Sequence, residues 1–486
     1  MENVMRKKIF ALIILVLCIL ASASCNPCKD SRRPSYFIDM DFDTETMQAA
    51  ATEQFTYTNT TDCTLNSLAF HLYPNAFSES AEQLPVTDRH KAAAYYNGVS
   101  YGGIEILRVE GDSPHDFEVD KEMLFVEIPD LKQGKSITFN IRFKLTMPAV
   151  NHRFGYTADT VNMGNFYPQL AVFEDGAFRM DRYYPIGDPF YSEMANYKVK
   201  LKIDKDYKAA ATGAAVKESL NIDTSTYTFE ADNVRDFAMV LSDKFTVINN
   251  RTGGININYY YLSDPLPENS LNTACSSIAV FSDIIGKYPY GSYTVAETNF
   301  VYGGMEYPQL VMIASDLAAN TREKVIVHET AHQWLYGLIG NDSIREAWID
   351  EGLTEFMTAL YYEEIGQSNI KKELVNQSFN AYIMYNSVYR TVGSVDTSMA
   401  KDLSEFASEY EYVTMVYTKG LLMFNTIYEI IGKDDFVKGM KNYYKKNCCK
   451  TARGEDLISE FNKVSKKKTA KIFEAWLYGK VVVISA

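Results

Sequence analysis

Two histidines four residues apart, with a glutamate directly after the first, occur in the segment VIVHETAHQWLYG at 325–337. In an α-helix, residues i and i+4 lie on one face, so His328 and His332 can direct their imidazoles at one point. Glu329 is rotated by roughly 100° from His328 about the helix axis, which places its carboxylate beside a shared metal ion. This offset suits a general base, and the spacing predicts a zinc site.

The alternative is that the two histidines only pack in a core or face solvent. The chain has six histidines, so a chance pairing at this spacing is uncommon. The neighbouring Val325, Ile326 and Trp334 predict a buried helix. Buried imidazoles need partners, and a metal ion provides one. We therefore expect one Zn²⁺ per chain.

A catalytic zinc needs a third protein ligand, and the segment REAWIDEGLTEF at 345–356 offers Asp350, Glu351 and Glu355. Glu351 opens a second predicted amphipathic helix and follows His332 after a spacer of eighteen residues. Glu355, one turn further along the same face, could accept the free ring N–H of a ligand histidine and fix its tautomer. A solvent-facing glutamate is an equally open interpretation of Glu355.

Several segments together resemble the aminopeptidase N family of zinc metallopeptidases, which are gluzincins. HETAH, the eighteen-residue spacer and WIDEG are similar to the family's zinc-site pattern. GGMEYP at 303–308 resembles its exopeptidase motif, and YVTMVYTKG at 412–420 resembles the segment that carries its catalytic tyrosine. FEAWLYG at 473–479 is similar to the end of the family's catalytic domain.

The resemblance implies a role for each residue of these motifs. The implied zinc ligands are His328, His332 and Glu351. Glu329 is implied as the general base and Tyr417 as the group that stabilises the oxyanion, with Tyr412 and Glu355 supporting the site. Glu306 would bind the substrate's free α-amine, and the adjacent Gly303, Gly304 and Met305 belong to the same substrate-binding segment. On the alternative interpretation, Glu306 only ends a strand and the glycines form a turn.

The sequence also departs from the family pattern. Tyr307 stands where the family usually has asparagine, so we expect altered contacts next to Glu306. The resemblance implies a short form that lacks the C-terminal helical domain of many relatives, and hence a more open cleft. Gln169 is a candidate amine contact from the first half of the chain.

The elements that position these residues fall into two predicted domains. β-like runs lie at 48–59, 67–74, 135–147 and 197–204. Asparagine and glycine cluster at 249–258, and the pattern then changes. Helical patterns follow at 271–286, 320–337, 351–366, 412–431, 434–446 and 455–478, with strands at 293–298 and 309–315. We expect an α+β protein, with an all-β saddle or sandwich domain at 26–248 and a thermolysin-like α+β catalytic domain at 249–486.

The start of the zinc helix also has a local signal. Asn320 with Glu323 three residues later matches a capping box, which predicts a helix that begins at Asn320.

The N-terminal segment has the features of a targeting leader. Arg6, Lys7 and Lys8 precede a short apolar run at 9–20, and small residues then lead to Cys25. We expect residues 1–25 to be a lipoprotein leader, with Cys25 lipidated and the protein attached to the cell membrane outside the cytoplasm. A plain secretory signal is the alternative. The formal net charge of −14 argues against a nucleic-acid partner.

The first hypothesis is therefore an extracytoplasmic zinc aminopeptidase that acts on peptides with a free N-terminus. A zinc endopeptidase of the same fold is a second hypothesis. A non-catalytic surface lipoprotein that binds peptides is a third, although a binder has no use for the acid at Glu329.

Overall fold

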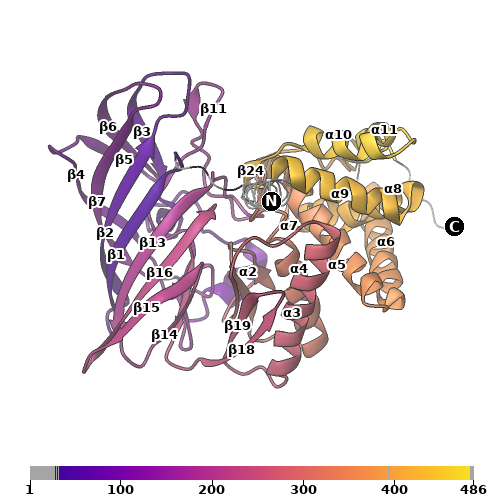
Figure 1. Cartoon of the computed structure of the whole chain (residues 1–486). Coiled ribbons are helices and arrows are strands. Elements are labelled where there is room, and N and C mark those ends of the chain that lie inside the picture. The colour runs from indigo at the N-terminus through magenta and orange to yellow at the C-terminus, as the bar shows by residue number, and fades with distance from the viewer. Residues whose placement is uncertain (1–27, 29, 31, 392, 394, 482–486) are drawn as a thin grey trace, which may run out of the picture. The chain divides into compact units, whose positions relative to one another are not determined.

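The computed structural model describes residues 28, 30, 32–391, 393 and 395–481. Arg32–Ala486 is one compact unit. In it, a β-rich half precedes a half that combines a sheet with helices, which confirms the predicted α+β fold (Figure 1). The predicted leader, including Cys25, lies outside the described residues. Within the described part of the chain, no helix has the length and apolar character needed to cross a membrane.

The largest sheet of the first half has seven strands. In spatial order they are β15 (Ala214–Leu220), β16 (Thr224–Val234), β13 (Ala195–Asp204), β1 (Ser35–Asp43), β2 (Gln48–Thr58), β7 (Ser136–Thr146) and β4 (Gly103–Glu110). Along β1, β2 and β13, buried and exposed side chains alternate. This period of two is typical of a sheet that packs one face on a core.

Two four-stranded sheets belong to the same half. One has the order β10 (Gln169–Leu170), β3 (Leu65–His71), β6 (Met123–Leu131), β5 (Phe117–Asp120). The other has the order β14 (Lys208–Ala211), β17 (Met239–Ser242), β9 (Val161–Met163), β8 (Phe154–Tyr156). A hairpin of β11 (Phe173–Glu174) and β12 (Ala177–Phe178), helix α2 (Asp88–Ala94) and a 3₁₀ turn at Tyr73–Phe77 complete it.

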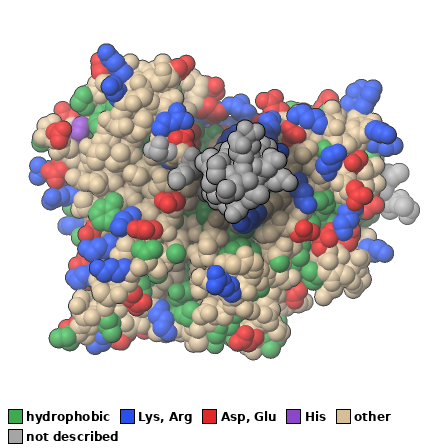
Figure 2. All heavy atoms as spheres, viewed as in Figure 1, with side chains coloured by type: hydrophobic (Ala, Val, Ile, Leu, Met, Phe, Trp, Pro, Cys, Tyr) green, Lys and Arg blue, Asp and Glu red, His purple; other side chains and the backbone are tan. Residues whose placement is uncertain are grey.

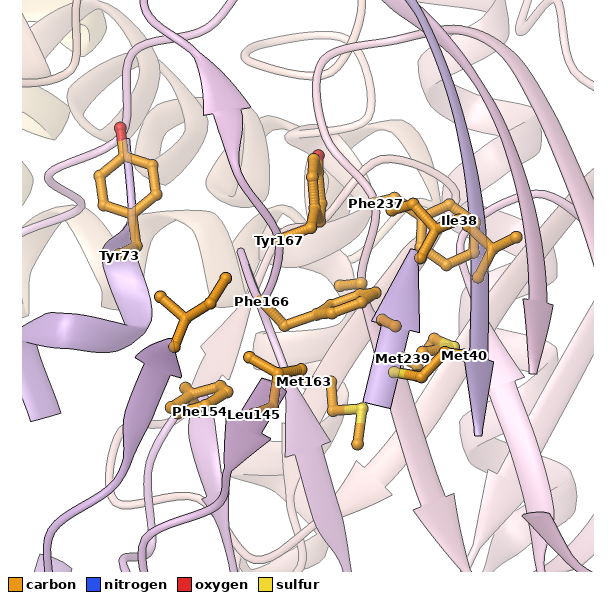
Figure 3. Close-up of a cluster of buried hydrophobic side chains, with 14 of the residues drawn as sticks. Ile38, Met40, Tyr73, Leu145, Phe154, Met163, Phe166, Tyr167, Phe237 and Met239 are labelled. Carbon is orange, nitrogen blue, oxygen red and sulfur yellow. The ribbon is translucent and has the colours of Figure 1, made fainter. Parts of the chain in front are cut away.

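Apolar side chains from different sheets of this half meet in one core. Figure 3 shows Met40 of β1 near Met239 of β17, and Leu145 of β7 near Phe154 of β8. All four side chains are buried. The sheets are therefore layers of a single domain, as the saddle or sandwich prediction requires.

A five-stranded mixed sheet opens the second half. Its order is β18 (Thr246–Thr252), β19 (Ile255–Tyr261), β20 (Ser292–Thr298), β22 (Leu310–Ala314), β21 (Gly304–Met305). Strands β19, β20 and β22 run parallel, and every residue of β20 and β22 is buried, as expected for strands covered on both faces. The predicted boundary between residues 248 and 249 falls inside β18.

Helices make up most of the remaining chain. They are α3 (Pro267–Ile284), α4 (Ala319–Ala331), α5 (Leu353–Glu364), α6 (Ser368–Arg390), α7 (Glu409–Tyr412), α8 (Lys419–Ile431), α9 (Lys433–Asn447), α10 (Gly454–Val464) and α11 (Thr469–Leu477). Two π-helical turns, η2 (Trp348–Gly352) and η4 (Val413–Thr418), a 3₁₀ turn at Leu403–Glu405 and the short pair β23 (Ile339–Gly340) and β24 (Lys450–Thr451) lie between them. On the face shown in Figure 2, acidic and basic side chains are interspersed.

Several helix boundaries differ from the predictions. The run 455–478 is two helices, α10 and α11, and the run 412–431 is interrupted by η4. Helix α6 was not predicted. The predicted capping box is wrong, because Ala318 is the N-cap residue and Asn320 lies inside α4.

A buried ion-pair cluster holds the first turn of α4 instead of the capping box. Arg322 donates to Asp264 at 2.8 Å and to Glu297 at 3.1 Å, and all three residues are buried. Glu297 belongs to β20, so these bonds fasten the start of the zinc helix to the sheet.

Candidate metal centre

Three of the predicted residues converge on one point. His328 comes from α4, His332 is the C-cap residue directly after it, and Glu351 comes from η2. The two Nε2 atoms are 3.1 Å apart, and Glu351 Oε2 is 3.3 Å from His328 Nε2 and 3.2 Å from His332 Nε2. The three side chains are buried, so their polar atoms face one another with little solvent between them.

These separations fit a zinc ion. A tetrahedral zinc with nitrogen and oxygen ligands at about 2.0–2.1 Å places neighbouring ligand atoms roughly 3.3 Å apart. The three observed separations are close to this value. Two histidines and one carboxylate are also the donor set of a catalytic zinc site that keeps one position open. Burial alone would raise the pKa of Glu351, but the His332 and His328 side chains hold it well below its usual value, as a ligand carboxylate requires.

The end of α4 supports the second ligand. The sequence predicted a helix to residue 337, but α4 ends at Ala331 and the chain turns directly after His332. In this turn, His332 Nδ1 lies 2.8 Å from the carbonyl oxygen of Leu335 and donates to it when Nε2 is the ligand atom. The early helix end thus fixes the ring tautomer of His332. For His328, Nδ1 faces Glu355 Oε1 at 3.5 Å, longer than a well-formed hydrogen bond.

Glu329 lies beside the ligands in the same cavity. It is buried, and burial raises its pKa to about 7 although the two histidines act in the opposite direction. Gly304 of β21 packs directly against it. A Cβ atom on Gly304 would lie 2.3 Å from Glu329 Oε1. Only glycine at position 304 therefore leaves Glu329 its present position.

Tyr417 faces the centre from η4. Its ring stacks on His328 with 6.1 Å between ring centroids, and the Tyr412 ring meets the Tyr417 ring at 5.8 Å. Burial and the Glu351 carboxylate raise the pKa of Tyr417 well above 10, so its hydroxyl keeps a proton to donate.

The backbone of Gly352, at the end of η2, touches that of Gly420, at the start of α8. A Cβ atom on Gly420 would lie only 2.5 Å from the Gly352 Cα.

Two further carboxylates, Asp188 and Glu306, lie next to the zinc ligands, and we call them the acidic cradle. One oxygen of each lies within 4.8 Å of the other and of a Glu351 oxygen. Arg153 donates to Asp188 at 2.8 Å. Burial raises the pKa of both cradle carboxyls. The Glu351 carboxylate raises the pKa of both further, and Asp188 also raises that of Glu306. The bond from Arg153 goes to Asp188 Oδ1, and Asp188 also lines the cavity described below.

Sequence reasoning did not select Asp188. Its one signal was the turn-forming dipeptide Gly187–Asp188 before a proline. Gly187 has a φ of 71°, and its Cα faces the Tyr412 ring, where a Cβ would lie 2.9 Å from the Tyr412 hydroxyl. Tyr412 therefore packs on the turn that presents Asp188.

The predicted site residues enclose a cavity of about 260 Å³. Its described lining residues are Asp188, Tyr302, Gly303, Gly304, Glu306, Thr321, Lys324, Val325, His328, Glu329, His332, Glu351, Glu355 and Tyr417. Two expected contacts lie elsewhere. The Met305 side chain is in the hydrophobic core, and Gln169 donates to the carbonyl of Arg235 at 3.1 Å within the β-rich half.

Tyr307, the departure from the family pattern, joins the two halves. Its ring is fully buried, and its hydroxyl donates to Asn165 Oδ1 at 2.9 Å. Its carbonyl accepts from Gln333, the neighbour of His332, at 3.1 Å. The segment that carries Glu306 is thus held between the zinc helix and the β-rich half.

Comparison with known proteins identifies similar sequences and a similar fold. The model of the peptidase family M1 domain matches residues 269–476. Residues 269–476 are a peptidase family M1 domain. The predicted relationship to the aminopeptidase N family of zinc metallopeptidases is therefore confirmed, and Zn²⁺ is the cofactor of the M1 domain.

Individual relatives match at low identity. The chain is 30% identical to leucine aminopeptidase 2-1 of Scheffersomyces stipitis over 187 residues, which cover 35% of this chain and 30% of that protein. It is 23% identical to aminopeptidase 2 of Candida albicans over 420 residues, which cover 76% and 45%. The chain thus spans less than half the length of these relatives.

The fold extends beyond the matched domain. A mutant of the M1 zinc metallopeptidase from Deinococcus radiodurans superposes with a TM-score of 0.69, covering 94% of this chain and 95% of that chain at 14% identity. The β-rich half and the M1 domain together therefore have the two-domain fold of that metallopeptidase.

Proposed function

We propose that the protein is a zinc aminopeptidase, which hydrolyses the first peptide bond of peptides with a free N-terminus. The observation that supports this proposal most directly is that the acidic cradle lies beside the three metal-binding side chains, those of His328, His332 and Glu351. A substrate's ammonium group suits a pair of carboxylates, and the short distance from Asp188 and Glu306 to Glu351 leaves room for a single residue before the scissile bond. The names of the aminopeptidases that the chain resembles support it further.

We assign the individual residues the catalytic roles that the sequence predicted. His328, His332 and Glu351 would hold the zinc. When bound, zinc supplies a Lewis acid that polarises the scissile carbonyl and lowers the pKa of an adjacent water. Glu329 would take a proton from the attacking water and deliver it to the departing amine. Tyr417 donates a hydrogen bond to the carbonyl oxygen as negative charge develops there.

A panel of aminoacyl fluorogenic substrates tests the proposal, with and without a chelator. We expect cleavage that the chelator abolishes and added zinc restores. In Glu306→Gln and Asp188→Asn, KM for these substrates rises by at least about tenfold, because each change removes one charged partner of the amine. An unblocked peptide and its N-acetyl derivative provide the matched control. Equal cleavage of both would instead identify a zinc endopeptidase, and no cleavage of either would favour a peptide-binding protein.

We also propose that the protein is exported and attached to the cell membrane through a lipid on Cys25. The charged and apolar runs of the leader support this, and Cys25 itself lies outside the described residues. Cells fed a labelled fatty acid should incorporate the label into the wild-type protein. A Cys25→Ala variant that keeps the label would contradict the proposal.

A further inference from the structure

One wall of the catalytic cavity has a charge opposite to the rest. Among the described residues that line the cavity, Lys324 is the one lysine or arginine. The other charged side chains are five carboxylates, those of Asp188, Glu306, Glu329, Glu351 and Glu355. A cavity with so many acids repels an anionic group, and Lys324 is the only cation among these lining residues that could bind one.

Lys324 lies at the end of the cavity away from the acidic cradle. One face of α4, together with its C-cap residue, lines the cavity with Thr321, Lys324, Val325, His328, Glu329 and His332. Lys324 precedes His328 by one turn. Its Nζ atom lies 3.7 Å from Glu355 Oε2, and Glu355 also faces His328 Nδ1. The cradle oxygens lie within 4.8 Å of an oxygen of Glu351, which faces the Nε2 edge of His328. Lys324 instead faces Glu355, which lies at the Nδ1 edge of the same ring. Along the helix axis, Lys324 and His332 are about 12 Å apart.

This order fixes which part of a substrate meets Lys324. A peptide with its amine in the cradle and its first carbonyl at the metal centre directs its leaving residues toward Lys324. One extended residue spans roughly 3.3–3.6 Å, and one helical turn rises about 5.4 Å. The lysine side chain therefore reaches the first or second residue after the scissile bond.

We propose that Lys324 binds a carboxylate on the leaving side of the substrate, and so makes the enzyme selective for peptides that carry one there. The carboxylate is the C-terminus of a di- or tripeptide or the side chain of an acidic residue. This inference rests on the proposed aminopeptidase function and adds a substrate class to it.

The ammonium group of Lys324 is available for this role. Its separation of 3.7 Å from Glu355 Oε2 exceeds hydrogen-bond distance, and the Lys324 side chain is 37% exposed. The simpler interpretation is that Lys324 only forms a surface ion pair with Glu355. Such a pair is worth little and would not depend on the substrate's charge.

The test compares three substrates of the zinc-loaded enzyme, where X is the residue that the wild-type enzyme prefers: the dipeptide X-Ala, its amide X-Ala-NH₂, and X-Glu-NH₂. In Lys324→Met, we expect the ratio of kcat/KM for X-Ala to that for X-Ala-NH₂ to fall about tenfold, the worth of one charge-assisted hydrogen bond. Lys324→Arg keeps the wild-type ratio. Lys441→Met, which removes the same charge from an exposed position on α9, is the matched control.

A loss confined to X-Ala assigns the C-terminal carboxylate to Lys324, and a parallel loss with X-Glu-NH₂ adds the acidic side chain. For each acidic substrate, X-Ala or X-Glu-NH₂, the ratio is its kcat/KM divided by that for X-Ala-NH₂. If both ratios are unchanged in Lys324→Met, the inference is overturned. It is also overturned if the ratios fall equally in Lys441→Met. Because the ratio is taken within one variant, incomplete folding cancels. If the wild-type enzyme cleaves none of the three, the proposed function itself fails, which is a separate result.

Discussion

Gly304 is the position where one added methyl group should reach the chemistry most directly. A Cβ at this position would lie 2.3 Å from Oε1, 2.6 Å from Cδ and 2.7 Å from Cγ of Glu329. Unbonded carbon atoms prefer separations of about 3.5–4.0 Å. Gly304 has no positive φ, so an alanine can adopt its backbone conformation without strain. In Gly304→Ala, the Glu329 side chain must therefore move by about 1 Å to regain contact distances.

A displacement of this size should act on the rate. Misplacing a catalytic group by about 1 Å can cost on the order of a hundredfold in rate, or about 2.7 kcal/mol in activation free energy. We expect kcat of Gly304→Ala to fall by this factor with the best aminoacyl substrate. The three atoms nearest to the new methyl group all belong to Glu329 and none to a zinc ligand, so zinc content measured by plasma mass spectrometry should stay at the wild-type level.

Gly303→Ala is the matched control, because it makes the same substitution one residue away. A Cβ on Gly303 would meet only Val325 Cγ2, at an ordinary 3.6 Å. We expect this variant to lose at least about tenfold less activity than Gly304→Ala, since it leaves Glu329 in place. A kcat for Gly304→Ala within about threefold of wild type, or equal losses in both variants, would refute the displacement of Glu329.

Three further predictions concern stability. The Glu53 carboxyl is fully buried in the β-rich half without a hydrogen-bond partner among the described residues, and burial raises its pKa well above 4.5. The contribution of this raised pKa to stability is present below the unfolded pKa and is lost by up to about 1.4 kcal/mol per pH unit as the pH rises toward the folded pKa. In urea unfolding, the free energy of unfolding of Glu53→Leu should therefore depend less on pH than that of the wild type. Parallel pH profiles of the two proteins would contradict this. Tyr307→Phe leaves the Asn165 carbonyl without its donor and should lower the free energy of unfolding by about 1–3 kcal/mol, whereas an unchanged urea midpoint would show that this bond adds nothing. Arg322→Met leaves Asp264 and Glu297 buried without their cation and should destabilise by about 3–5 kcal/mol; thermal unfolding at the wild-type temperature would argue against the cluster as an anchor of α4.

The zinc ligands could be predicted because their signal is local. His328 and His332 share one helix, so their four-residue spacing determines that they meet. Glu351 came from the family's spacer length, and the η2 turn that presents it has no 3.6-residue period to detect. Tyr417 likewise lies in a π-helical turn and was identified by its segment, not by a helical pattern.

Asp188 could not be predicted because its partners are distant in sequence. It lies close to Glu306 only when the β-rich half packs against the M1 domain. No local pattern in the amino-acid sequence predicts that contact. Helix α6 was missed for a different reason. Only Lys371, Tyr382, Tyr385 and Asn386 of its 23 residues are buried, so it lacks the apolar stripe by which an amphipathic helix is recognised.

The measurement that tests the metal centre most directly is anomalous diffraction from crystals of the purified protein at the zinc absorption edge. We expect one strong peak per chain, within bonding distance of His328 Nε2, His332 Nε2 and Glu351 Oε2. A zinc-loaded crystal with no peak among these three atoms, or with its peak on other side chains, would contradict the proposed centre.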